Sequence, residues 1–521
     1  MRCIPLFLAV LLWWSVAFAA LANELTVLNY HDILPESEED SYGVSRSRFV
    51  AQMDYLKQNG YNLISLAFLD KVQAGEAKLP YKALMLTFDD GLLSYYEFAA
   101  PLLKMYGFPS VVAIVTGWID GQNLPPEYKG KLMNWVQIKE LSQSKLVEIA
   151  SHTHNLHHGI LSNPQGNEKA AAITRQYFPF TKTYETEEEY RQRIQLDLRR
   201  SAERFTQELG KAPNTVAWPY GDYNQVLVEE SLKVGYKFQL TLQDGPTPKE
   251  QLPVINRIIL VQNPDLRVFV DELNYKHHFN FTRRFTEISL DPFIGVDMEK
   301  QDKILGKLLD RLQKLNVNMV LISPFTEDYK HSFFPTKNMP VATDMLNRAI
   351  HQIRTRLRIN HIYLKLPAQM PVKNVLKLYA DMSRHNTFKG IVIDGVIDEQ
   401  QARNIKKVVA YYQMNMEVGA MGMPRNAAPY DFIIYPINAN TTRTRIRNLV
   451  TELSEFTKPV YFSLKRDSQV NDKSLISALQ ALRSFGVKHF GYGVDDYVND
   501  LPNEDIISNE FTALLLKKLG G

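Results

Sequence analysis

The chain has 521 residues, of which 45% are hydrophobic and 22% charged, both close to the averages of folded globular proteins. This composition excludes a disordered chain, a collagen and a coiled coil, and the length predicts roughly two to four domains. With 60 basic and 57 acidic residues the net charge is +3, too small for a protein that must neutralise many phosphates, so we expect no nucleic-acid partner.

The first 22 residues have the pattern of a secretory signal peptide. Arg2 precedes an apolar run over 4–18, and Ala20-Leu21-Ala22 has the small residues that signal peptidase reads, so we expect cleavage before Asn23. The alternative is a retained membrane anchor, for which the run is short. The single cysteine, Cys3, lies inside this leader, so the mature chain has no thiol for a lipid anchor, a disulfide or catalysis. No other stretch predicts a membrane span.

The first half of the mature chain, residues 23–275, alternates short apolar runs with helical patterns. Helices are expected at 45–59 and 187–209. The predicted strands are Leu25–Asn29, Ala83–Phe88, Ser110–Val115, Val147–Ser151, Thr215–Trp218 and Phe238–Thr241. This alternation predicts an α/β domain with a largely parallel sheet or barrel. Residues 276–285 have no clear period and are the expected linker.

The second half, residues 286–521, repeats strand and helix more regularly. Its predicted strands are Glu287–Leu290, Asn318–Ser323, His361–Leu366, Gly390–Asp394, Met416–Ala420, Asp431–Pro436, Val460–Leu464 and Lys488–Tyr492. Eight strands with helices between most of them predict a C-terminal (β/α)8 barrel, and the available length is close to the usual ~250 residues. The gap over 421–430 is too short for a helix, so one turn of the barrel is expected to be irregular.

Two adjacent carboxylates end one of the predicted strands. Thr87-Phe88-Asp89-Asp90-Gly91 follows an apolar run, and Gly91 leaves the chain free to turn. Both aspartates can therefore reach one cavity, one as a metal ligand and the other as a base. The alternative is a solvated Asp-Asp-Gly turn.

Four of the twelve histidines lie within the eight residues 151–158, directly after another predicted strand. A structural core histidine normally stands alone, so this clustering at a strand end indicates a metal site. Two neutral imidazoles and one carboxylate leave a divalent cation an open position for water, whose pKa falls towards ~7. The pattern therefore favours a hydrolytic centre over the alternative, a histidine-rich surface loop.

Together these residues resemble the polysaccharide deacetylases of the NodB-homology type, carbohydrate esterase family 4. Residues 87–91 are similar to the first family motif, and Ser151-His152-Thr153 with a second histidine is similar to the second. Ala217-Trp218-Pro219-Tyr220-Gly221 is similar to the third, and Leu240-Thr241-Leu242 stands where the fourth forms an apolar rest for the acetyl methyl group. The resemblance implies that the first half is a distorted (β/α) barrel of the polysaccharide deacetylase type.

The departures from this pattern are informative. The ligand histidines must be His152 and His157, one residue wider than usual, and Trp218 replaces the usual arginine. The family's histidine acid, ordinarily late in the domain, is missing around 255–259, whereas the segment 29–32 near the mature N-terminus carries His31. This permuted order, the wider pair and the second barrel resemble the periplasmic poly-β-1,6-N-acetyl-D-glucosamine N-deacetylases of Gram-negative biofilm export.

The resemblance implies a role for each residue of the site. Asp90, His152 and His157 would bind one divalent metal ion, either zinc, cobalt or nickel, because affinity order alone does not choose among them. Asp89 would be the catalytic base, and His31 the general acid that protonates the leaving amine.

The third and fourth motifs imply substrate-binding residues. Trp218 and Tyr220 are expected as sugar-stacking walls, with core packing as the alternative for Trp218. Leu242 is expected near the acetyl group.

For the second half, the resemblance implies a glycoside-hydrolase-like barrel that binds, and in some members cleaves, the partly deacetylated polymer. Chemistry in such barrels lies at the C-terminal ends of the strands, where Asp394, Glu417 and Asp495 are the candidates. Because one aspartate stands close to the fourth strand instead of a run of acidic residues, polymer binding is favoured over cleavage.

The expected function is thus metal-dependent partial N-deacetylation of poly-β-1,6-N-acetyl-D-glucosamine in the periplasm, with release of acetate. An outer-membrane export porin is an implied partner. The alternatives are a peptidoglycan deacetylase with the same chemistry, or a non-catalytic export scaffold.

Overall fold

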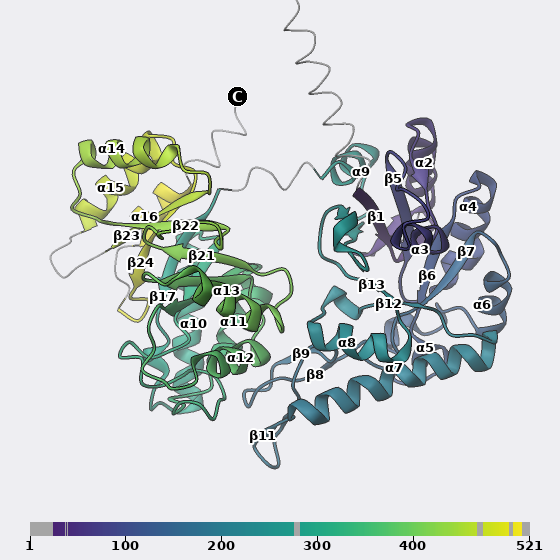
Figure 1. The fold of residues 1–521 in the computed structure, drawn as a ribbon, viewed down its shortest axis with the longest axis horizontal. Coiled ribbons are helices and arrows are strands. Elements are labelled where there is room, and N and C mark those ends of the chain that lie inside the picture. Colours follow the sequence, from purple (N-terminus) through teal and green to yellow (C-terminus); the bar gives the residue numbers. More distant parts are fainter. Residues whose placement is uncertain are drawn as a thin grey trace, which may run out of the picture. The chain divides into compact units, whose positions relative to one another are not determined.

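The structure, a computed structural model, describes residues 24–36, 38, 40–275, 282–465, 472–499 and 504–512 (Figure 1). The expected leader at 1–22, with Cys3, and residues 276–281 of the expected linker lie outside this part of the chain. The described residues group into two compact units. The first holds 24–160, 169–173 and 185–275, and the second holds 161–168, 174–184 and the described residues from 282 onward.

A largely parallel ten-stranded sheet organises the first unit. Its hydrogen-bonded path is β14-β1-β5-β6-β7-β12-β13-β15, with β16 beside β1 and β4 beside β5. The strands of this sheet are β1 (Glu24–Tyr30), β4 (Asn62–Leu63), β5 (Ala83–Phe88), β6 (Ser110–Ile114), β7 (Val147–Ser151), β12 (Thr215–Ala217), β13 (Phe238–Leu240), β14 (Thr247–Pro248), β15 (Val254–Ile255) and β16 (Ile258–Ile259). All six residues of β5 are buried, as expected for a parallel strand covered on both faces.

The sheet nearly closes on itself. β15 pairs with β13, whereas β16 pairs with β1 at the other end of the path. Asn256 and Arg257, the two residues between these strands, therefore span the joint of a distorted barrel.

Helices and short strands surround this sheet. The helices are α2 (Arg46–Gln58), α3 (Leu66–Gln73), α4 (Ala100–Tyr106), α5 (Thr116–Ile119), α6 (Trp135–Ser142), α7 (Glu187–Leu209), α8 (Gln225–Val234) and α9 (Leu266–Leu273). The additional strands of this unit are β2 (Asp32–Leu34) and β3 (Gly43–Ser45), whereas β8 (Gly159–Leu161) and β9 (Glu168–Ala170) each straddle a boundary between the units. The strands β10 (Tyr177–Phe178) and β11 (Thr183–Tyr184) belong to the second unit.

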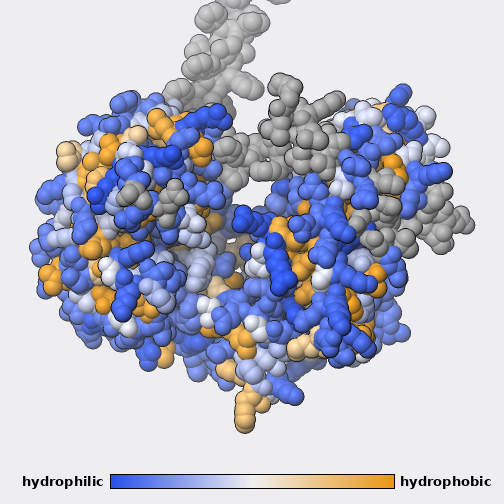
Figure 2. Space-filling model, turned by 180° about the vertical axis from the view of Figure 1, so that it is seen from behind, coloured by the Kyte–Doolittle hydropathy of each residue, from blue (hydrophilic) through white to orange (hydrophobic). Residues whose placement is uncertain are grey.

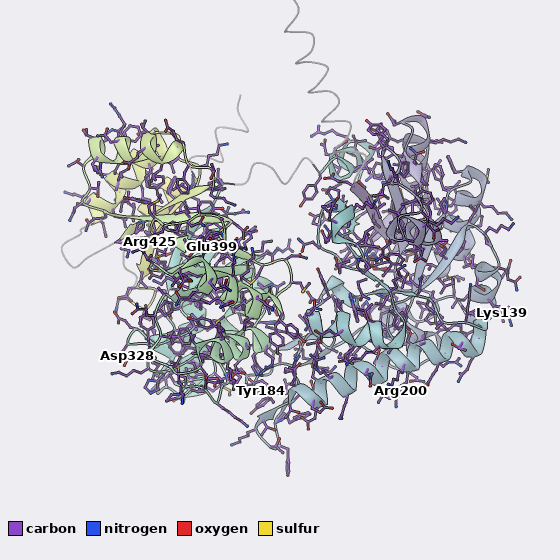
Figure 3. The ribbon with its side chains drawn as sticks, viewed as in Figure 1. Lys139, Tyr184, Arg200, Asp328, Glu399 and Arg425 are labelled. Atoms are coloured by element: carbon purple, nitrogen blue, oxygen red, sulfur yellow. The ribbon has the colours of Figure 1, made fainter. Side chains whose placement is uncertain are left out.

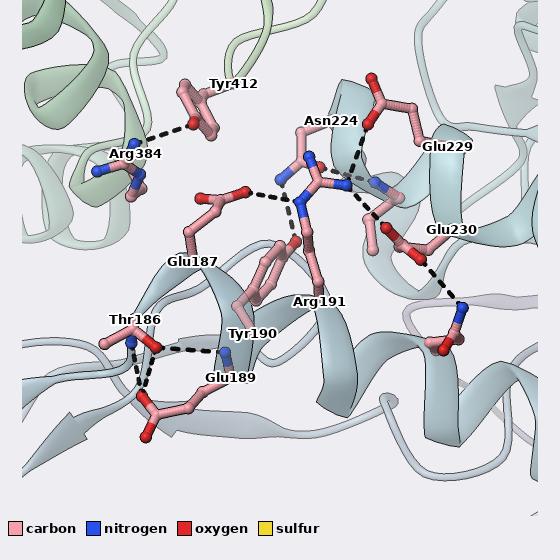
Figure 4. A network of polar contacts seen from close by, with 12 residues as sticks. Thr186, Glu187, Glu189, Tyr190, Arg191, Asn224, Glu229, Glu230, Arg384 and Tyr412 are labelled. Carbon is pink, nitrogen blue, oxygen red and sulfur yellow. Dashed lines mark hydrogen bonds and ion pairs between the residues drawn. The ribbon is translucent and has the colours of Figure 1, made fainter.

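The long helix α7 is tied firmly to its neighbour α8. A capping box formed by Thr186 and Glu189 starts α7, and one turn later Arg191 pairs with Glu229 and Glu230 of α8 at 3.1 and 2.7 Å (Figure 4). This fixed helix carries the aspartate that shapes the histidine loop described below.

Eight parallel strands form a closed barrel in the second unit. They are β17 (Arg284–Ile288), β18 (Met319–Ile322), β19 (His361–Pro367), β20 (Gly390–Asp394), β21 (Glu417–Met421), β22 (Phe432–Asn438), β23 (Val460–Lys465) and β24 (Phe490–Asp495). The helices are α10 (Met298–Leu315), α11 (Leu346–Leu357), α12 (Val375–His385), α13 (Glu399–Ala410), α14 (Arg443–Ser454), α15 (Asp472–Ser484) and α16 (Glu504–Thr512).

The predicted fold class is confirmed for both halves, with differences at element ends. β17 starts three residues before the predicted Glu287, and no helix separates β21 from β22, as predicted. One apolar cluster fills the barrel interior, and a larger one lies between the strands and the surrounding helices.

The face of the molecule drawn in Figure 2 is mainly hydrophilic. On the face drawn in Figure 2, hydrophobic residues are scattered in small groups among hydrophilic ones. No helix of the described part is both long and apolar enough to span a bilayer.

Candidate metal centre

The predicted site residues lie at one edge of the first unit's sheet. Asp89 and Asp90 follow β5 and His152 follows β7, and both strands flank β6 in parallel. Because the carboxyl ends of parallel strands meet at the same edge, the two motifs come together. Asp90 and Gly91 have φ of +71° and +74°, so the chain turns sharply away directly after the strand.

Asp90, His152 and His157 form a compact group of possible metal ligands. Oδ1 of Asp90 lies 3.5 Å from Nε2 of His152 and 3.4 Å from Nε2 of His157, and the three ligand atoms are all within 4.8 Å of one another. This Oδ1 atom is buried without a hydrogen-bond partner among the described residues, whereas Oδ2 accepts a hydrogen bond from the Tyr128 hydroxyl at 2.9 Å. A divalent cation fits this donor set.

The protonation of the two imidazoles suits metal binding. Nδ1 of His152 lies 2.8 Å from the carbonyl oxygen of Ala217 and donates to it, which leaves the Nε2 lone pair facing Asp90. Burial lowers the pKa of both His152 and His157 to about 4. Both rings are therefore neutral at pH 7, the form that binds a metal.

A hydrogen-bonded loop explains the five-residue spacing of the histidines. Asp197 on α7 accepts the backbone N–H groups of His154 and Asn155 at 2.9 and 2.7 Å. Nδ1 of His154 lies 3.0 Å from Oγ1 of Thr116, outside the ligand group. The loop is thus held by its middle, and His157 returns to face Asp90.

Asp89 is held by two residues that the sequence analysis missed. Nη1 of Arg257 lies 2.7 Å from Oδ1 of Asp89, and Nδ2 of Asn29 donates to Oδ2 at 3.0 Å. Burial alone would raise the pKa of Asp89, but the charge of Arg257, together with His152 and His31, holds it well below its usual range. Arg257 supplies the cation that the third motif lacks, because Trp218 stands in place of the usual arginine. The absence of that arginine was the sequence signal that another cation had to be sought.

His31 reaches the same edge of the sheet because it directly follows β1, the neighbour of β5. Its proximity helps to lower the pKa of Asp89 and that of His157. Its Nδ1 is buried without a partner in the described part of the chain, and its ring centre lies 5.2 Å from that of Tyr42. The structure thus brings all five predicted metal-centre residues together.

The predicted substrate-binding residues behave differently from one another. Trp218 is fully buried and donates through Nε1 to Gln239 at 3.0 Å, so the expected stacking wall is corrected to core packing. Tyr220 is 50% exposed, with its ring 4.6 Å from that of His157. Leu242 is partly buried and lies so close to Gly221 that a Cβ there would meet Leu242 Cβ at 2.2 Å.

Trp118 is an aromatic residue of the site that the sequence analysis missed. Its ring centre lies 4.6 Å from that of His157 and 4.7 Å from that of Tyr128. It could not be predicted from the motifs, because it lies outside all four of them, in the short helix α5.

Of the barrel candidates, Glu417 lies at the wrong end of its strand, and Asp495 lies at the predicted end but is buried. Glu417 is the first residue of β21 and so lies at the opposite end, where it accepts a hydrogen bond from Tyr363 at 2.6 Å and pairs with Lys389. Asp495 ends β24 but is 3% exposed, and Nη2 of Arg311 on α10 lies 2.9 Å from it. Both carboxylates are therefore structural ion-pair partners.

Asp394 does lie at the C-terminal end of its strand, beside a pair that the sequence analysis missed. Nζ of Lys365 is 2.7 Å from Oε2 of Glu287 and 3.7 Å from Oδ2 of Asp394. Glu287 also accepts a hydrogen bond from Ser463 at 3.2 Å. Asp394 is 30% exposed and accepts no hydrogen bond from the described side chains.

A cavity of about 350 Å³ opens between two loops at this face of the barrel. The loops follow β20 and β21, and their lining residues include Glu399 and Arg425, labelled in Figure 3. Ligand sites of such barrels are built from these loops.

Comparison with known proteins agrees with this geometry. Residues 76–239 match the family "Polysaccharide deacetylase", and residues 287–375 match "Hypothetical glycosyl hydrolase family 13". The chain is 31% identical over 358 residues to the poly-beta-1,6-N-acetyl-D-glucosamine N-deacetylase of Escherichia coli K12, covering 66% of this chain and 53% of that protein. The chain thus spans about half the length of that relative.

Two further relatives each match somewhat less than half of the chain. The protein of the same name from Staphylococcus aureus N315 is 27% identical over 253 residues, which cover 46% of this chain and 79% of that one. The solved deacetylase domain of BpsB from Bordetella bronchiseptica is 37% identical with a TM-score of 0.41, covering 45% of this chain and 95% of that one. The predicted resemblance to this family is confirmed.

Proposed function

We propose that this chain, whose residues 76–239 form a polysaccharide deacetylase domain, hydrolyses N-acetyl groups of β-1,6-linked poly-N-acetylglucosamine with a bound metal ion. The observation that carries the proposal is the buried Oδ1 of Asp90, which has no hydrogen-bond partner among the described residues and faces Nε2 of His152 and of His157. The printed names of the relatives support this polymer as the substrate.

Asp90, His152 and His157 would hold the ion, and zinc, cobalt and nickel all suit this donor set. When bound, the ion supplies Lewis-acid activation of a water and of the acetyl carbonyl. Asp89 takes the proton of the attacking water. Arg257 and Asn29 hold its carboxylate ionised and in place.

His31 gives a proton to the nitrogen of the leaving amine, which departs as glucosamine while acetate is released. Its position at the end of β1 supports this role, because it lies on the same edge of the sheet as Asp89. Tyr220 and Leu242 border the substrate, since Tyr220 lies against His157 and Leu242 lies close to Gly221, the residue after Tyr220.

The location and partner are also part of the proposal. The leader pattern at 1–22 supports export to the periplasm. The polymer would then leave through an outer-membrane export porin. This partner rests on the resemblance alone.

For the barrel we propose binding of the partly deacetylated polymer, with Asp394 as its recognising carboxylate. The cation of Lys365 lies 2.7 Å from Glu287 and 3.7 Å from Asp394, whereas glycoside cleavage generally uses two opposed carboxyl groups. Polymer binding is therefore favoured over hydrolysis.

The decisive experiment is acetate release from β-1,6-linked N-acetylglucosamine oligomers before chelation, after chelation and after restoring each metal. We expect loss and recovery of activity, with Asp89→Asn and His31→Ala each inactive despite retained metal. Acetate from cell-wall fragments but not from these oligomers would identify a peptidoglycan deacetylase. Metal-restored protein that releases no acetate from either would indicate a scaffold.

A further inference from the structure

Tyr42 is an exposed aromatic residue that the proposed reaction does not use. Its side chain is 53% exposed, and its ring centre lies 5.2 Å from that of His31 at an interplanar angle of 49°. Single exposed apolar side chains are common on protein surfaces, so exposure alone says little. The setting of Tyr42 distinguishes it from such residues.

The backbone on both sides of Tyr42 is clamped. Its own N–H donates to Oδ1 of Asp40 at 2.7 Å. The carbonyl oxygens of Ser41 and Gly43 accept the N–H groups of Gln262 and Asn263 at 2.7 and 3.2 Å. An exposed ring on a fixed backbone loses little conformational entropy when a ligand covers it, which is the property of a preorganised binding surface.

Tyr42 also has a counterpart that lies against a predicted metal ligand. Tyr220 is 50% exposed and lies against His157, as Tyr42 lies against His31. The Tyr42 hydroxyl contributes to the raised pKa of Tyr220. With Trp218 buried, these two tyrosines are the half-exposed aromatic faces among the site residues described here.

A polar cavity of about 620 Å³ adjoins the clamped loop. It is lined by Asp40, Ser41, Gln262 and Asn263, among other residues. Asp40 also contributes to the raised pKa of Tyr128, the hydrogen-bond partner of Asp90. Its volume lies within the roughly 300–1,000 Å³ of ordinary ligand sites. Carboxylate, hydroxyl and amide groups suit the hydroxyls of a sugar, and the C–H face of a pyranose ring suits a tyrosine ring.

We propose that Tyr42 is the stacking platform for the sugar unit next to the one being deacetylated, and that the cavity beside it accommodates that unit. This inference rests on the proposed function, because it assumes a hexosamine chain as the ligand. It makes Tyr42 a specificity-determining residue that favours long chains over single sugars.

The test measures binding and turnover separately. Calorimetry with protein from which a chelator has removed the metal gives the affinity for a β-1,6-linked N-acetylglucosamine pentamer. Binding of the pentamer should not need the ion. We expect Tyr42→Ala and Tyr42→Leu to bind the pentamer about tenfold more weakly, a typical loss for one aromatic contact, and Tyr42→Phe to bind like the wild type. In the metal-loaded protein the same variants should raise KM for the pentamer about tenfold, with kcat and activity on N-acetylglucosamine itself unchanged.

The matched control is Phe180→Ala, which removes a ring that is 99% exposed in the other unit and should change neither quantity. Equal melting temperatures of all variants would show that the losses are not unfolding. Wild-type affinity in Tyr42→Ala, or a Tyr42→Phe as weak as Tyr42→Ala, would overturn the inference. A wild type that binds the pentamer but releases no acetate would refute the proposed function and leave the role of Tyr42 supported.

Discussion

The metal centre of the first unit and the C-terminal face of the barrel both contain buried carboxylates, but these carboxylates have different partners. Asp90 faces two neutral imidazoles and pairs with no lysine or arginine of the described chain. In the barrel, Glu287 and Asp495 each face a cation, at 2.7 and 2.9 Å. A carboxylate that is already paired with a cation supports the fold, whereas one that faces the unshared lone pairs of two neutral imidazoles is prepared for a metal ion.

The largest expected effect follows from removing one of the two imidazoles of the metal centre. We expect His152→Ala to lose the metal and to lower acetate release by at least about 1,000-fold, because both the activated water and oxyanion stabilisation disappear. Asp495→Asn, which removes a carboxylate from the barrel, should leave acetate release unchanged. Metal content and acetate assays check both, and a metal-loaded, active His152→Ala protein would contradict the assigned ligand set.

The next largest effect concerns the barrel pair. Lys365→Met leaves Glu287 buried without its cation, so the free energy of unfolding of the barrel should fall by about 3–5 kcal/mol in denaturant titrations. Lys389→Met is the matched control, because its pair with Glu417 is about one-third exposed on both sides and should contribute less than about 1 kcal/mol. Equal losses in the two variants would show that Lys365 does not neutralise a buried charge.

A smaller effect should follow from loosening the histidine loop without touching a ligand. Asp197→Ala removes the acceptor of two loop N–H groups, and we expect metal affinity to fall about 10–100-fold, as for other residues that orient ligands. Glu208→Ala, on the same helix, breaks only a partly exposed pair with Arg204 and should bind metal normally. Competition with a chelator measures both affinities.

The smallest expected effect tests a barrel carboxylate whose hydrogen-bond partner is a tyrosine. Burial raises the pKa of Asp344 to about 6, while the Tyr184 hydroxyl donates to it. Since the folded state binds the proton more tightly than the unfolded state, this group makes unfolding easier as pH rises from about 4 to 6. Asp344→Asn should therefore stabilise the protein by about 1–2 kcal/mol at pH 7.5 and change little at pH 4. Stabilisation that is equal at both pH values would contradict the shift.

Sequence alone predicts those parts of the site that lie at strand ends. Asp89, Asp90 and His152 each follow an apolar run, so their common edge follows from parallel pairing. Arg257 could not be assigned in this way, because it lies 168 residues from Asp89 and reaches it only through the joint between β15 and β16.

The barrel shows where such reasoning fails. Its eight strands follow from their regular apolar runs, but the end at which a carboxylate lies depends on the first and last residue of each strand. Glu417 was assigned to the wrong end, although it lies near the start of the predicted strand over 416–420 and at the start of β21. Asp495 was misjudged because its side chain contacts a helix, and Arg311 is 184 residues away in sequence.

The histidine loop has a consequence for recognising this arrangement in other proteins. Gly117 donates its N–H to the carbonyl oxygen of His154 at 3.0 Å, and a Cβ at position 117 would stand 2.4 Å from that oxygen. Any side chain there would push the loop away from the first turn of α5. A chain that keeps two histidines five positions apart should therefore also keep a glycine about 35 residues before the first of them. In a sequence search this glycine can serve as a third marker beside the paired aspartates and the paired histidines. It separates chains that form this loop from chains that have only the same histidine spacing.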